Sequence, residues 1–292
     1  MAGGLKEVRE RISSVQNTMQ ITSAMKMVAA AKLRRAQDAI TRMRPYAEKL
    51  QAVLSNVSAS LDSSEGIYSQ QRPVKRVLLV AITSNRGLCG GFNNNIIKAV
   101  KTEMNLSEVE YHVLPLGKKA NDAFKKAKQM KPVGFSDDAW RIFDDLNFDA
   151  VQEVAEVIMA KFQDGTYDQV KIAYNRFVNA AMQVPTVESF LPLETDGNTE
   201  NAASSDTDYI FEPSQAEIVE RIIPNSLKVQ LYKGLLDSNA AEHGARMTAM
   251  HQATENAGEL LRDLRISYNK ARQAAITTEI LEIVAGSEAL DS

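Results

Sequence analysis

The sequence predicts an α/β protein whose two ends form a long antiparallel coiled coil. Three observations lead to this fold class. Apolar residues recur at alternating spacings of three and four from Leu5 to Leu61 and again from Leu236 to Thr278. Strand-like and helix-like runs alternate in the chain between them. Turn-forming residues are rare at the N-terminal end, which contains no glycine after Gly4 and a single proline. The predicted segments are 1–61, 62–212 and 213–292.

The N-terminal segment is expected to form one helix with a coiled-coil seam. Of the seventeen seam positions between Leu5 and Leu61, fifteen are apolar, and the exceptions are Thr22 and Lys26. A repeat held over this length is typical of a coiled coil and not of a helix packed on a globular domain. Pro45 lies off the seam, so it is expected to kink the helix without ending it.

The C-terminal segment repeats the pattern. Ten of its thirteen seam positions are apolar, and the polar ones are His243, Thr254 and Thr278. We expect the helix to begin near Pro213 and to end near Gly286, because proline suits a first turn and glycine suits the position after a last one. Pro224 is expected to bend the helix or to separate a short leading helix.

The middle segment predicts a mostly parallel sheet with crossover helices, a Rossmann-like α/β domain. The predicted strands are Val74–Thr83, Glu110–Leu116, Gln169–Val178 and Met182–Leu191. The predicted helices lie near Asn93–Glu103, Lys118–Gln129 and Phe148–Phe162. The acidic, polar stretch 194–208 is predicted to be a mobile surface loop.

The two terminal helices meet the α/β domain at their inner ends, so they pair antiparallel and project from it. The C-terminal helix is then expected to extend beyond its partner by about 17 residues, or roughly 25 Å at the α-helical rise. This tip contains no basic residue after Arg272, and much of it is apolar. Since a bare apolar helix is unstable in water, we expect other subunits to form a sleeve around it.

Composition excludes several classes of protein. The chain of 292 residues has a net charge of −3, one cysteine (Cys89) and three scattered histidines. These numbers exclude a disulfide framework and a strongly basic nucleic-acid binder, and they do not indicate a metal centre. No apolar run is long enough for a membrane span. The N-terminus lacks the pattern of a signal or transit peptide, which favours a bacterial source.

Charge is concentrated on the N-terminal helix, which carries ten basic and four acidic residues. These residues form either an ordinary solvated face or a basic collar that faces acidic loops of a partner. Nucleic-acid binding is disfavoured because no aromatic residue stands among the basic ones before Tyr46.

Three stretches resemble chemical sites without matching one. The loop 84–91 follows the first predicted strand, where a phosphate-binding turn would stand, but its sequence SNRGLCGG matches no phosphate-binding pattern. We interpret it as a tight turn and Cys89 as a packed thiol. The carboxylates between Asp137 and Asp149 fit helix capping and solvation better than a cation site. The sequence therefore predicts no catalytic, cofactor or metal residues.

Three longer stretches resemble one family. VQNTMQITSAMKMVAAAKLRRAQ (15–37), RGLCGGFN (86–93) and the stretch from ARMTAMHQ to EILEIVAG (245–286) are similar to the gamma subunit of F-type ATP synthase. The resemblance covers essentially the whole chain. It implies a central rotor stalk that couples proton-driven rotation to ATP synthesis and helps regulate ATPase activity and proton flow. It also implies a non-catalytic subunit without cofactors.

The implied partners are three alpha and three beta subunits, the epsilon subunit and the c-subunit ring, with no nucleic acid and no direct membrane insertion. The implied location is the cytoplasmic face of the bacterial inner membrane. Matched positions imply contact or coupling roles for Met25, Lys26, Arg246, Arg272, Gln273, Thr277, Thr278, Glu279 and Glu282. The plant-type redox insertion is absent.

Two alternatives remain at this point. One is a nucleotide-dependent α/β enzyme with coiled-coil arms, which would need a phosphate-gripping loop. The other is a passive coiled-coil tether, which would not need a sleeve around an apolar tip.

Overall fold

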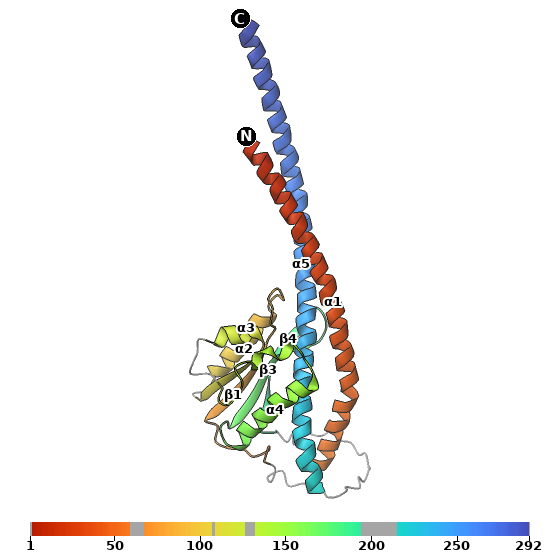
Figure 1. The fold of residues 1–292 in the computed structure, drawn as a ribbon, viewed down its shortest axis with the longest axis vertical. Helices are drawn as coiled ribbons and strands as arrows, with labels where there is room; N and C mark the ends of the chain where they lie inside the picture. The colour runs from red at the N-terminus through yellow and green to blue at the C-terminus, as the bar shows by residue number, and fades with distance from the viewer. Residues whose placement is uncertain (1, 59–66, 107–108, 126–131, 194–214, 292) are drawn as a thin grey trace. The chain divides into compact units, whose positions relative to one another are not determined.

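The computed structural model describes residues 2–58, 67–106, 109–125, 132–193 and 215–291 (Figure 1). The elements are α1 (Ala2–Ser58), β1 (Arg76–Ile82), α2 (Phe92–Met104), β2 (Glu110–Leu116), α3 (Lys118–Phe124), η2 (Ala139–Phe143), α4 (Phe148–Gln163), β3 (Gln169–Phe177), β4 (Gln183–Leu191) and α5 (Gln215–Asp291). The predicted fold class, an α/β domain with long terminal helices that pack together, is confirmed. The predicted loop 194–208 lies outside the described residues.

The chain forms two compact units. The shaft unit contains residues 1–30 and 246–292, and the body unit contains residues 31–245. Both α1 and α5 are continuous through the boundary between the units.

The body unit contains a four-stranded sheet in the order β2-β1-β3-β4. β1 pairs in parallel with β2 and β3, and β4 pairs antiparallel with β3. β1 is buried from Val77 to Ile82, as expected for a central strand covered on both faces. The predicted mostly parallel sheet is therefore confirmed, and each predicted strand is present within two residues of its predicted ends.

Two apolar cores lie on opposite faces of the sheet. On one face, side chains of α2 and α3 such as Ile96 and Phe124 pack against Val77, Leu79 and Ala81. On the other face, α4 and α5 pack against the alternate side chains of the same strand; Ile158, Phe162, Leu227, Leu231 and Leu235 are all fully buried there. Because strand side chains alternate between faces, β1 contributes to both cores.

The coiled-coil seam of the shaft unit follows the predicted spacing. On α5, the less exposed residues between 257 and 278 are Ala257, Gly258, Leu261, Leu264, Tyr268, Ala271, Ala275 and Thr278; all but Gly258 are predicted seam positions. On α1, Met27 is off the seam and is 65% exposed. This agreement fixes which face of each helix lies in the pair.

Two predicted boundaries are wrong. α3 ends at Phe124, several residues before the predicted Gln129, and residues 126–131 lie outside the described part of the chain. α5 continues past Gly286 to Asp291, since a glycine is only a weak stop when no sharp turn follows it. Of the two effects expected of Pro224, the separation of a leading helix does not occur, since Pro224 lies inside the continuous α5. A short 3₁₀ helix, η2, was not predicted.

Candidate coupling surface

The apolar seam of the shaft unit is interrupted by two threonines that face each other, Thr22 and Thr254, which we call the polar step. Thr254 of α5 places its hydroxyl 2.9 Å from Thr22 Oγ1 and 2.8 Å from the Met250 carbonyl, so its single hydrogen has two acceptors. The Thr22 hydroxyl donates to the Met19 carbonyl at 3.1 Å. Thr22 is 9% exposed. Two of the five polar exceptions in the predicted seams, Thr22 and Thr254, are thus paired with each other and satisfied.

One turn further along α1, Lys26 lies against α5. Its Nζ donates to His251 Nδ1 at 3.4 Å, and His251 Nε2 lies 3.6 Å from Glu255 Oε1. The sequence did not single out His251, because that residue stands just off the seam spacing. In an antiparallel helix pair, the numbers of two facing residues add up to a nearly constant value. Applied to the two predicted seams, this rule would have indicated His251 as the partner of Lys26.

Met25 and Arg246 belong to the same shaft unit as Lys26. Met25 is half-buried, and Arg246 is 9% exposed. A guanidinium that is this well buried is uncommon, because burial of a charge is unfavourable without compensating contacts. Arg246 stands eight residues before Thr254 on α5, about two helical turns from the threonine pair.

The pairing continues to the outer end of α1. Arg9 donates to the Tyr268 hydroxyl at 2.9 Å, and its guanidinium lies 5.8 Å from the centre of the Tyr268 ring. This hydrogen bond is the largest cause of a raised pKa at Arg9. The Thr22–Thr254, Lys26–His251 and Arg9–Tyr268 pairs share one antiparallel register.

In that register, no described residue of α1 stands opposite the end of α5. The start of α1 falls opposite the region near residue 275, and α5 continues to Asp291. Every residue from 279 to 287 is exposed. Ile280, Leu281, Ile283 and Val284 are 50–67% exposed. The predicted tip is therefore present, and at about 1.5 Å per residue its length is close to the predicted 25 Å.

The remaining predicted contact residues lie on or beside this tip. Thr278 is half-buried, whereas Arg272, Gln273, Thr277, Glu279 and Glu282 are exposed. The Thr277 and Thr278 hydroxyls donate to the carbonyls of Gln273 and Ala274 at 2.9 and 3.0 Å, four residues back in the helix. Their side chains are thus satisfied locally, and the tip presents methyl groups and carboxylates outward.

In the body unit, α5 is enclosed on nearly all sides. Between residues 222 and 245, all of which the structure describes, Lys233 is the one exposed residue. Leu231 faces the sheet, Ala241 and Ala245 pack with Cys89 and Phe92, and Tyr232 meets Phe148 edge to face. Gly244 allows the turn between β3 and β4 to approach, since a Cβ there would stand 3.2 Å from Ala180 backbone atoms.

The loop 84–91 forms part of this enclosure. Leu88 and Gly90 have positive φ angles of 64° and 58°, which confirms the predicted tight turn. The Ser84 N–H donates to Asn93 Oδ1 at 2.9 Å, and Asn93 Nδ2 donates to Cys89 Sγ at 3.1 Å. Cys89 is 2% exposed, as predicted for a packed thiol. These hydrogen bonds stabilise the conformation of the loop, and Cys89 packs against α5.

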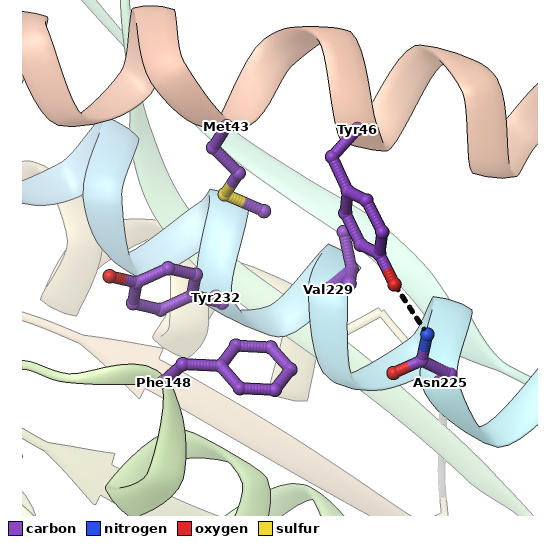
Figure 2. Close-up of a pocket in the computed structure, with 6 residues that line it drawn as sticks. All are labelled: Met43, Tyr46, Phe148, Asn225, Val229 and Tyr232. Atoms are coloured by element: carbon purple, nitrogen blue, oxygen red, sulfur yellow. Dashed lines mark hydrogen bonds between the residues drawn. The ribbon is translucent and has the colours of Figure 1, made fainter.

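A groove between α1, α4 and α5 lies at the level of the two helix prolines. Figure 2 shows Met43 and Tyr46 above Val229 and Tyr232, with Phe148 below; the groove has a volume of about 330 Å³. Asn225 Nδ2 donates to the Tyr46 hydroxyl at 2.7 Å. Tyr46 and Asn225 each follow a proline, and a proline within a helix removes one backbone hydrogen bond. The side-chain bond ties the two helices together where both backbones are weakened.

A carboxyl of α5 lies half-buried in the body unit. Burial raises the pKa of Asp237, and the negative charge of Glu188 acts in the same direction, while Lys233 opposes both. Glu188 also accepts from the Tyr174 hydroxyl at 2.9 Å. Burial, followed by the charge of Glu188, raises the pKa of Tyr174. These groups are structural contacts between α5 and the last two strands.

The predicted helix-capping role of the carboxylates holds only in part. The side chain that caps α4 is Asn147, which accepts from the Ala150 N–H at 2.8 Å, while Asp149 stands in the first turn. Asp144 accepts from Asn85 Nδ2 at 2.9 Å. Among the described residues, no three His, Cys, Asp or Glu side chains come together in a way that could hold a metal ion.

None of the helices in the described part of the chain is both long enough and apolar enough to cross a membrane.

Comparison with known proteins identifies the family. The family profile described as ATP synthase matches residues 4–290. The ATP synthase gamma chains of Flavobacterium psychrophilum and Cytophaga hutchinsonii are 56% and 49% identical; the alignments cover 98% of this chain and 98% of the first relative, and 99% of this chain and 99% of the second. A solved structure of the Euglena gracilis mitochondrial ATP synthase (OSCP/F1/c-ring) contains a chain with a TM-score of 0.66 and 21% identity, covering 99% of this chain and 95% of that one.

An α/β domain with two long terminal helices that pack together is the fold class of ATP synthase central-stalk proteins. The chain belongs to the ATP synthase gamma-chain family, the family of the rotor subunit of the F-type enzyme.

Proposed function

We propose that this chain turns inside a catalytic ring of three alpha and three beta subunits, driven by a c-subunit ring to which its body is attached together with epsilon. In this proposal the chain contributes no catalytic residues. It couples proton-driven rotation to ATP synthesis on the beta subunits, and it works at the cytoplasmic face of a bacterial inner membrane. Its family membership and its relatives' names support a place in this complex.

The observation that carries the proposal is the uneven surface of the shaft unit. Part of its length is a two-helix pair with polar steps, and the remainder is a single helix with exposed Ile280, Leu281 and Ile283. A rotor that lacks threefold symmetry presents a different surface to each of three equivalent subunits. Differential contacts of this kind are what shifts a subunit between conformations.

We assign the contacts to two groups of residues. The first group lies within about two helical turns of the threonine pair and comprises Met25, Lys26 and Arg246. The second group lies on the tip and comprises Arg272, Gln273, Thr277, Thr278, Glu279 and Glu282. Exposure of five of the six tip residues supports this assignment. The basic collar on α1 would face acidic loops of the ring, where charge complementarity orients the partners.

The coupling role is tested at Arg246. Arg246→Gln removes the charge from the buried stretch beside the polar step. We expect ATP-driven proton pumping to fall more than ATP hydrolysis, because torque passes less faithfully to the ring while the catalytic sites are unchanged. The matched control is Arg262→Gln, which removes the same charge from an exposed position of α5. Equal loss of pumping and hydrolysis in Arg246→Gln would contradict the proposed role.

A further inference from the structure

The contact between Lys26 and His251 has a property that the threonine pair beside it lacks: one of its members is an imidazole. Histidine is the side chain whose charge changes between pH 5 and 8 in its ordinary state. Lys26 Nζ lies 3.4 Å from Nδ1 of this ring, and Glu255 Oε1 lies 3.6 Å from Nε2. His251 is half exposed, so protons reach it from solvent.

The hydrogen-bond donors around His251 determine which tautomer of its ring fits this geometry. An ammonium group has three donors and no acceptor, so Lys26 bonds to Nδ1 only when Nδ1 carries no hydrogen. The neutral ring then carries its hydrogen on Nε2, which faces the Glu255 carboxylate. The neutral ring thus lies between the Lys26 ammonium and the Glu255 carboxylate, and both of its contacts are electrostatically favourable.

Protonation reverses one of the two contacts. The ring then carries hydrogens on both nitrogens, and its positive charge faces the Lys26 ammonium while its attraction to Glu255 grows. Along the two helices, residues 22–30 of α1 carry no charged side chain besides Lys26, and residues 247–255 of α5 carry none besides Glu255. The repulsion is relieved when Lys26 moves away from the ring.

We propose that His251 is a positioning residue that holds Lys26 against α5 when neutral and releases it when protonated. The inference rests on the proposed coupling role of the surface that contains Lys26. A released Lys26 no longer bridges the two helices at the polar step, and it no longer occupies a fixed place on the rotor surface. Coupling between hydrolysis and pumping therefore weakens as the pH on this side of the membrane falls.

The test uses the complete complex in vesicles, with ATP hydrolysis and ATP-driven pumping measured at pH 7.5 and pH 6.0. We expect the pumping-to-hydrolysis ratio of the unmodified complex to fall about twofold at the lower pH, the effect that an exposed charge pair supports. In His251→Gln, which keeps a polar side chain that does not titrate, the ratio stays constant. In Glu255→Gln the fall moves to lower pH, whereas the control Glu259→Gln behaves like the unmodified complex.

Parallel pH profiles in the unmodified complex and in His251→Gln would overturn the inference. A pH-independent ratio in the unmodified complex, combined with lost coupling in Arg246→Gln, would overturn it while leaving the proposed function intact. The contact itself is read from the ¹⁵N signals of histidine-labelled full chain at pH 8. Lys26→Met should move the Nδ1 signal of His251 towards that of a free acceptor, and an unmoved signal would also refute the proposal.

Discussion

Replacing Leu231 by alanine tests how tightly the body unit holds α5. Leu231 is fully buried in the core between the sheet and α5. Truncation of a leucine in such a place costs about 3 kcal/mol, from lost burial and from the cavity left behind. With a dependence on urea of about 2 kcal/mol per molar, the unfolding midpoint should fall by about 1.5 M.

Fluorescence of Trp140 is the readout, because Trp140 is the one tryptophan of the sequence and lies in η2 of the body unit. The control is Leu281→Ala, since Leu281 is 63% exposed on the tip. Exposed truncations of this kind change stability by less than about 0.5 kcal/mol. A midpoint shift in Leu231→Ala no larger than in Leu281→Ala would refute the idea that the sheet core anchors the helix.

Two further predictions concern the same enclosure. Gly244→Val should destabilise the body unit by about 1–3 kcal/mol, because the valine side chain meets the Ala180 backbone. The control Gly258→Ala, at a position with nothing within 4 Å, should instead stabilise its helix. Equal urea midpoints for the two variants would contradict this prediction. Burial raises the pKa of Asp237 above its ordinary 3.8, so the folded state binds this proton more tightly and stability falls as pH rises from 3.8 through the folded pKa. Asp237→Asn should therefore gain stability at pH 7 and lose that advantage near pH 3.5, and a gain that does not depend on pH would argue against a buried carboxylate.

The spacing of apolar residues predicted the fold well, because the apolar positions in the sequence are the positions that the helix pair and the sheet bury. The seam from Leu236 to Thr278 can be recognised in the sequence because apolar residues recur at the positions that face the partner helix. An apolar residue on the outer face of a two-helix pair would be exposed to water. The central strand was also recognised from its apolar residues. β1 is covered on both faces, so its sequence is almost continuously apolar. The length of the tip followed from the difference in helix length alone.

Helix ends and cross-helix partners were predicted less well. A glycine near position 286 looks like a stop, but in a long exposed helix with no following turn it costs only about 1 kcal/mol. The capping residue of α4 is Asn147, which stands among carboxylates of similar capping preference, so the sequence alone did not distinguish it.

The most informative contacts in the candidate surface involve residues outside the apolar repeat. His251 was missed because a search for apolar seam positions ignores polar side chains that reach across the pair. The close approach of the β3–β4 turn to Gly244, which the lack of a side chain allows, was not predicted either. Such contacts depend on the register between two segments that are far apart in sequence, and a single-segment pattern does not contain that register.

The most direct test of the rotor account is a reversible crosslink between the shaft unit and the surrounding ring. Met27→Cys places a thiol at a position that is 65% exposed and off the seam, while the native Cys89 is buried. A disulfide from this position to a cysteine on a ring subunit should stop ATP turnover, and reduction should restore it. Full turnover in a completely crosslinked complex would contradict rotation of this chain against the ring.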